Sequence, residues 1–103
     1  NCADEAEAER TARSFCALLG LEYHPGNSSI FAGTAVECMK TPFLGARGHL
    51  AIGTNSVDRA VYHLELQGAA FDESTRKTDA KGAAKSIYLK DEIGGFAVHL
   101  VQK

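Results

Sequence analysis

The sequence predicts an α+β fold made of two copies of one helix-and-strands unit. Three observations support this prediction: residues 1–40 and 55–103 share one order of features, each copy begins with a helical pattern, and each ends in patterns typical of strands. A chain of 103 residues has room for one hydrophobic core. We therefore expect a single domain over residues 1–103.

Two helices are predicted, one in each copy. Each copy opens with the pattern Asn-x-x-Asp, in which Asn1 and Asn55 are typical helix N-caps and the carboxylates that follow favour the positive end of the helix dipole. Each helix is expected to end at a glycine, Gly20 or Gly68, because glycine adopts the left-handed cap conformation at low cost. The apolar stripes are Ala8, Ala12, Phe15 and Leu19 in the first copy and Val57, Ala60, Val61 and Leu64 in the second.

Hairpins are predicted after the helices, where the apolar period changes from 3.6 to 2. Residues 29–31 match residues 86–88 as Ser-Ile-aromatic, and residues 35–40 match residues 97–102. In each copy these segments predict two strands joined by a turn that contains glycine. The polar residues 72–84 predict a loop.

Residues 48–54 predict a further strand that leads into the second helix, so the second copy is expected to be a βαβββ module. The fold is then a pair of such modules. Module one covers residues 1–40, a connector with proline and glycine covers 41–47, and module two covers 48–103. Module one lacks the matching first strand, which we expect to precede Asn1.

Strand alternation separates an apolar face from a face that carries polar side chains. Glu37, His49 and His99 lie on the second face, and each has an alanine two positions away on its own strand. Small neighbours leave volume, so we expect this face to line a cavity into which the three side chains project. The expected core face consists of Val36, Cys38, Leu50, Ile52, Val98 and Leu100.

A carboxylate and two imidazoles on rigid strands are suitable ligands for a divalent metal such as Zn, Mn, Ni or Fe. The candidate metal ligands are therefore Glu37, His49 and His99. The same side chains also suit acid–base chemistry, in which Glu37 and His99 are the candidate catalytic residues. A single histidine on a strand is more often structural, and we expect His24 and His63 to face solvent.

The composition narrows the range of partners. The net charge is -2, the pI is about 6.1 and no basic run is present, so no nucleic-acid partner is expected. The apolar stretches are far shorter than the roughly 20 residues that cross a bilayer, so no membrane partner is expected either. The three cysteines form no CxxC pair and suggest no disulfide framework, which favours a cytoplasmic location.

The repeat, the βαβββ unit and the polar face together resemble the vicinal oxygen chelate (glyoxalase/bleomycin-resistance) superfamily. In that family two βαβββ modules form a cupped sheet, and residues from the first and last strand of each module bind a metal. The resemblance implies that Glu37 is the last ligand of module one and that His49, in Gly-His-Leu-Ala-Ile, is the first ligand of module two. His99 stands where the family usually has glutamate, a departure that removes one negative charge.

A second resemblance concerns the segments GNSSIFAGTAVECMK, GHLAIGTNSVDRAV and IYLKDEIGGFAVHLVQK. They are similar to the C-terminal extension of some bacterial 2-keto-3-deoxy-6-phosphogluconate/4-hydroxy-2-oxoglutarate aldolases. This implies a domain that belongs to a lyase and meets a small substrate such as a 2-oxo acid. The Schiff-base lysine of such an aldolase lies in a (β/α)8 barrel of roughly 200 or more residues, outside this chain.

Other functions fit the same residues. One is a metal-free domain that binds a small molecule or joins subunits. A weaker alternative is an iron dioxygenase with two histidines and one carboxylate, whose ligands normally occur in another order along the chain. Because the open edges of a cupped sheet can be covered by a partner, we also expect a homo-oligomer.

Overall fold

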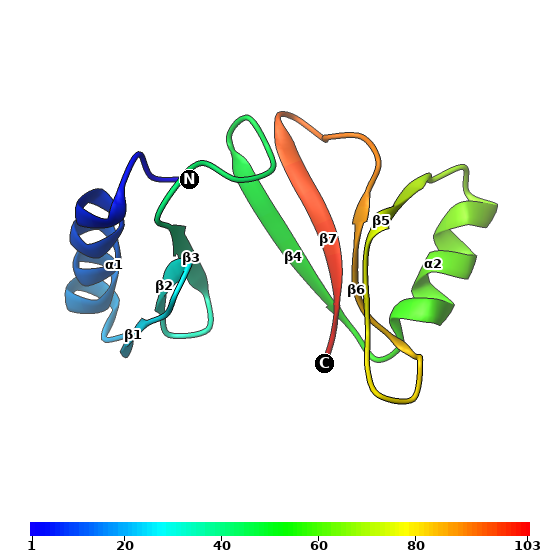
Figure 1. The fold of residues 1–103 in the computed structure, drawn as a ribbon, viewed down its shortest axis with the longest axis horizontal. Helices are drawn as coiled ribbons and strands as arrows, with labels where there is room; N and C mark the ends of the chain where they lie inside the picture. The colour runs from blue at the N-terminus through cyan, green and yellow to red at the C-terminus, as the bar shows by residue number, and fades with distance from the viewer. The chain divides into compact units, whose positions relative to one another are not determined.

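The computed structural model describes all residues from Asn1 to Lys103. The chain divides into two compact units, unit 1 with residues Asn1–Phe43 and unit 2 with residues Leu44–Lys103. Each unit combines one helix with one sheet, which confirms the predicted α+β class (Figure 1). The boundary between the units falls inside the predicted connector 41–47. No helix is long and apolar enough to cross a membrane.

Unit 1 consists of one helix and three strands: α1 (Glu5–Leu19), β1 (Tyr23–Pro25), β2 (Ser29–Ala32) and β3 (Val36–Met39). Neighbouring strands are antiparallel in the order β1-β2-β3, so the sheet is a simple meander. The turn between β2 and β3 contains Gly33 with a φ of 59°, as the sequence predicts. In Figure 1 the blue helix α1 lies against this sheet.

The N-cap of α1 is Asp4, so the prediction of Asn1 as the cap is wrong. The Asp4 carboxylate accepts the backbone N–H of Glu7 at 2.8 Å, and the Glu7 carboxylate accepts the N–H of Ala3 at 2.6 Å. This reciprocal pair satisfies donors at the start of the helix, as in a capping box. Asn1 instead exchanges two hydrogen bonds with the backbone of Phe43, each 3.2 Å long. The predicted left-handed cap at Gly20 is confirmed, with a φ of 65°.

The core of unit 1 lies between α1 and the sheet. The small residues Ala8 and Ala12 are fully buried and let the helix backbone approach the strands closely. Phe15 and Leu19 belong to the predicted stripe but are exposed, because strands of three or four residues are too short to cover the last turns of a 15-residue helix. The buried cluster consists of Cys2, Ala8, Ala12, Ile30 and Cys38.

Unit 2 consists of five elements: β4 (Gly48–Thr54), α2 (Val57–Leu66), β5 (Phe71–Thr78), β6 (Ala84–Leu89) and β7 (Phe96–Gln102). The strand order is β4-β7-β6-β5, with β4 and β7 parallel and the other neighbours antiparallel. Residues 48–103 thus contain a strand, a helix and three strands, although β5 lies largely within residues 72–84, for which a loop is predicted. Figure 1 shows α2 beside β5 and β6; the helix packs against β6 and β7, and its residue Asp58 contacts Arg76 of β5.

The start of α2 also differs from the prediction by one residue. Ser56 is the N-cap, and its hydroxyl oxygen accepts the backbone N–H of Arg59 at 3.2 Å, so Asn55 precedes the cap. At the other end the cap residue is Gln67. Gly68 follows it with a φ of 95°, so the predicted glycine lies one position beyond the cap.

Residues 72–84 do not form the single loop that their polarity predicts, because β5 occupies residues 71–78. This strand lies at the edge of the sheet and pairs irregularly with β6, where polar side chains are tolerated and deter pairing with other chains. At the irregularity the hydroxyl of Thr75 accepts the N–H of Tyr88 at 2.9 Å and donates to the carbonyl oxygen of Asp72 at 2.6 Å. A side chain thus replaces a backbone partner in the ladder.

The core of unit 2 lies between α2 and the strands β6 and β7. Leu100 is buried there as predicted, but Leu50 and Ile52 are 47% and 50% exposed, which corrects their assignment to the core. They share the helix-side face with Leu100, since Ile52 is its register partner, yet β4 lies beyond the strands that α2 contacts. The buried cluster consists of Val57, Val61, Ala84, Ile87 and Leu100.

The hairpins β2–β3 and β6–β7 share one pairing register. In both hairpins the serine, the isoleucine and the aromatic residue of the first strand pair with corresponding residues of the second strand. Glu37 and His99 are therefore equivalent positions, each opposite an aromatic residue. The pairs are Ser29 with Met39, Ile30 with Cys38 and Phe31 with Glu37 in unit 1, and Ser86 with Val101, Ile87 with Leu100 and Tyr88 with His99 in unit 2.

Candidate functional site

Glu37 lies on the face of the unit 1 sheet that points away from α1. Its neighbour Cys38 is buried against the helix, and adjacent residues of a strand point to opposite faces. The side chain is half-buried, and its Oε1 accepts the hydroxyl hydrogen of Ser29 at 2.7 Å. Ser29 is only 6% exposed, so this hydrogen bond holds the carboxylate of Glu37 against a buried part of the sheet.

His49 and His99 lie on the helix-free face of the unit 2 sheet, as predicted. They come from the neighbouring parallel strands β4 and β7, in a register that pairs His49 with Ala97 and Ala51 with His99. Each imidazole therefore lies beside an alanine, whose small side chain leaves room for the two rings to approach each other. Their centroids are 5.6 Å apart with an interplanar angle of 74°. Both side chains are half-buried.

Tyr88 is the third ring of this group, and it is not among the site residues predicted from the sequence. Its ring stacks on His99 with 4.5 Å between centroids and an interplanar angle of 10°, and it meets His49 edge-on at 6.4 Å. Strand alternation could have identified Tyr88 from the sequence. Ile87 belongs to the core, so the next residue on the strand must face the opposite side of the sheet. We name His49, Tyr88 and His99 the ring cluster.

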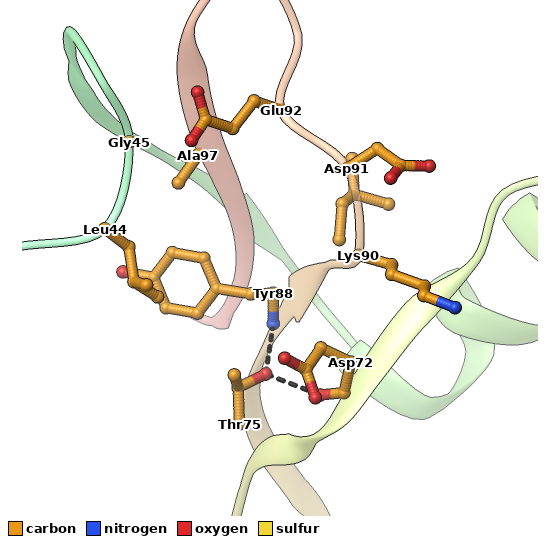
Figure 2. A pocket seen from close by; sticks show the side chains of 10 residues that line it. Leu44, Gly45, Asp72, Thr75, Tyr88, Lys90, Asp91, Glu92 and Ala97 are labelled. Carbon is orange, nitrogen blue, oxygen red and sulfur yellow. Dashed lines mark hydrogen bonds between the residues drawn. The ribbon is translucent and has the colours of Figure 1, made fainter.

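A small open pocket of about 100 Å³ adjoins the ring cluster in unit 2. Figure 2 shows Tyr88 and Ala97 among its lining residues, with Leu44 and Gly45 on the connector side and the carboxylates of Asp72 and Glu92 at its rim. Typical ligand pockets hold about 300–1,000 Å³, so only a small molecule or part of one fits here.

Two further histidines lie outside the ring cluster and face solvent, as predicted. His24 is exposed and lies beside Glu22, with 3.1 Å between the imidazole Nε2 and the carboxylate oxygen. His63 is exposed on α2, edge-on to Tyr62. Neither is positioned to join the candidate site.

The predicted metal ligands are divided between the units, with Glu37 in unit 1 and His49 and His99 in unit 2. Within either unit no three His, Cys, Asp or Glu side chains gather closely enough to hold a metal ion. The two histidines do form a pair of adjacent donors on one face. The three-residue ligand set therefore stays a prediction.

Comparisons with family models, with curated proteins and with solved structures find no significant match to this chain. The resemblance to the vicinal oxygen chelate superfamily and to the aldolase extension therefore stays an expectation from the sequence.

Proposed function

We propose that the chain is a glyoxalase-like domain that binds a divalent metal through His49 and His99, with Glu37 as the predicted third ligand. The observation that carries the proposal is the 5.6 Å separation of the two imidazole rings. Two imidazoles bound to one tetrahedral Zn²⁺ at 2.0–2.1 Å have centroids about 5 Å apart. Only a small side-chain movement is needed to bring both onto one ion.

The chemistry of the donors suits Zn, Mn, Ni or Fe, which accept neutral imidazole and carboxylate ligands. Ser29 donates a hydrogen bond to Glu37, and Tyr88 stacks on His99. Hydrogen bonds like the one from Ser29 orient metal ligands in known sites. Both ligand types therefore already have a partner that limits their movement.

The shared register of the two hairpins supports the paired-module part of the proposal. In the superfamily that the chain resembles, ligands come from the first and last strands of each module. His49 lies on β4 and His99 on β7, the first and last strands of unit 2, and Glu37 lies on β3, the last strand of unit 1.

The substrate that we propose is a small 2-oxo acid, in keeping with a domain that belongs to or assists an aldolase. A bound metal would act as a Lewis acid toward adjacent oxygens of such a molecule. We propose Glu37 as the general base and His99 as the group that polarises or protonates an oxygen. The pocket beside Tyr88 has room for a molecule of this size.

The metal proposal is tested by isothermal titration of the whole chain, purified without chelator, with Zn²⁺, Ni²⁺ and Mn²⁺. We expect one site, at least tenfold weaker in His49→Ala and in His99→Ala, and lost in the double variant. His63→Ala is the matched control, since this exposed histidine lies outside the site. Absence of binding in the unmodified chain, or binding unchanged in the double variant, would overturn the proposal.

Metal-free binding of a small molecule is the second candidate function. It is favoured by the pocket, whose lining residues all belong to unit 2, and by the aromatic wall that Tyr88 provides. A titration with pyruvate in the presence of a chelator separates the two functions. Binding that persists supports the metal-free function, whereas binding that requires added metal supports the first.

We also propose that the chain forms a homo-oligomer. The supporting feature is β4, an outer strand of its sheet that exposes Leu50 and Ile52 on one face. The mass in solution, measured by light scattering, should be a multiple of the chain mass. Ile52→Lys should shift it toward that of the single chain, and a monomeric unmodified protein contradicts the proposal.

A further inference from the structure

Cys2 and Cys38 are far apart in the sequence but adjacent in unit 1. The backbone N–H of Cys2 donates to the carbonyl oxygen of Met39 at 3.2 Å, which places Cys2 beside the end of β3. Both cysteines belong to the same buried cluster, with 7% and 3% of their surfaces exposed. Their arrangement brings the segment before α1 into contact with the last strand of unit 1.

The two thiols also interact electrostatically. Burial raises the pKa of the Cys38 thiol, and the neighbouring Cys2 raises it further, in part through a side-chain hydrogen bond. Both cysteines are free in the structure.

We propose that Cys2 and Cys38 are an oxidisable pair that forms an intramolecular disulfide. The oxidant is a low-molecular-weight disulfide such as glutathione disulfide. The Cys2 thiolate attacks it and releases one glutathione thiolate, and Cys38 then attacks the Cys2 sulfur of the mixed disulfide and releases the second. The two protein thiols lose two protons and two electrons, and both are recovered in two molecules of glutathione.

Cys2 is the residue that the oxidant reaches first. It is the more exposed of the pair, and it lies between the exposed residues Asn1 and Ala3 in a segment outside the helices and strands. Attack by the buried Cys2 sulfur therefore requires a displacement of this segment. The burial of Cys38, which is 3% exposed, then favours the internal disulfide over a second mixed disulfide, because glutathione reaches a buried sulfur poorly.

The disulfide would connect the start of α1 to β3, the strand that carries Glu37 on its other face. The cross-link closes a loop that contains the whole of α1, β1 and β2. Such a link restricts the unfolded chain, so unit 1 should unfold at a higher temperature when oxidised. This effect requires no metal and does not depend on the proposed function.

The test is oxidation of the whole chain with glutathione disulfide, followed by peptide mapping and thiol titration. Cleavage after arginine, lysine and glutamate places the three cysteines on separate peptides. We expect a cross-linked peptide pair with Cys2 and Cys38, a mass lower by about 2 Da, and one remaining thiol at Cys16. Cys16→Ser, the matched control, should give the same cross-link with no remaining thiol.

Three results contradict the proposal. One is a chain that keeps all three thiols after oxidation while it is folded. Another is a cross-link that involves Cys16. The third is stable glutathione attachment at Cys2 with no internal disulfide. Because peptide mapping of the unmodified chain decides between these outcomes, the test does not depend on whether Cys2→Ser or Cys38→Ser folds.

Discussion

The ring of Tyr88 lies parallel to the ring of His99, with 4.5 Å between their centroids and 10° between their planes. The two residues are register partners on the antiparallel strands β6 and β7. Stacking of this kind adds about 0.5–1.5 kcal/mol beyond the burial of the rings. Tyr88 therefore holds the imidazole of His99 in one orientation on the face that also carries His49.

Loss of this stack should weaken metal binding without removing a ligand. We predict that Tyr88→Ala lowers the affinity for Zn²⁺ by up to about 10-fold, which corresponds to the energy of the lost stack. Tyr88→Phe keeps the stacked ring and should bind within about threefold of the unmodified chain. Titration calorimetry measures both, and equal affinities in the two variants would show that the stack has no part in the site.

The carboxylate of Asp58, on α2, connects this helix to β5 and β6. One oxygen accepts the backbone N–H of Ala84 and the other accepts the guanidinium of Arg76, each at 3.0 Å. Ala84 is buried, so removal of the carboxylate leaves its N–H without this partner. We predict that Asp58→Ala lowers the free energy of unfolding by about 1–3 kcal/mol. Chemical denaturation measures this loss, and Asp91→Ala, at an exposed loop position, should change stability by less than about 0.5 kcal/mol.

Glu73 should make stability depend on pH. A hydrogen bond from Arg76 lowers the pKa of its carboxyl group below the usual value. A depressed pKa in the folded state means that the stabilisation is present above the pKa of the unfolded chain and is lost as pH falls through the folded pKa. We therefore expect Glu73→Gln to lower the melting temperature at pH 7 and to have no effect at about pH 2. An equal effect at both values contradicts this assignment.

Gly45 occupies a position at which no side chain fits. Its φ is 90°, and a Cβ would overlap the carbonyl oxygen of Gly48 and approach the backbone nitrogen of Ala97. Gly45→Ala should therefore destabilise unit 2 by more than the roughly 1–2 kcal/mol that a left-handed conformation alone costs. Gly20→Ala is the control, because its φ is also positive but nothing lies within 4 Å of the added Cβ. Similar losses in the two variants would contradict the steric argument.

Ile87 and Ile52 lie on the same sheet but differ in burial, so their replacement compares a core position with a surface position. Ile87 is fully buried, whereas Ile52 is half exposed. We predict that Ile87→Ala lowers the free energy of unfolding by about 2–5 kcal/mol, and that Ile52→Ala costs less than about 1 kcal/mol. Denaturant titration provides both numbers. A larger loss at Ile52 than at Ile87 would show that unit 2 packs differently in solution.

The strands of unit 2 were predictable where apolar alternation is strong. The strand at residues 48–54 and the hairpin with Tyr88 and His99 were found from local periodicity and matched segments. The strand β5 was missed because an edge strand buries little and carries the polar composition of a loop. The caps at Asp4 and Ser56 were missed because Asn-x-x-Asp offers several equivalent capping side chains, and the surrounding chain selects among them.

The candidate site was predictable only in part. Strand alternation correctly placed His49 and His99 on the helix-free face of unit 2 and Glu37 on that of unit 1. The contact between Tyr88 and His99 depends on which strands become neighbours, and alternation alone does not determine strand order. The pairing of Cys2 with Cys38 likewise depends on tertiary structure, because no spacing rule relates two cysteines across a helix and two strands.

The central claim is that His49 and His99 bind one metal ion, and X-ray absorption at the zinc edge tests it most directly. For the chain loaded with one equivalent of Zn²⁺ we predict nitrogen ligands at about 2.0–2.1 Å with the scattering of two imidazoles. The His99→Ala variant should retain only one. A zinc spectrum without imidazole scattering, or one that His99→Ala leaves unchanged, contradicts the claim.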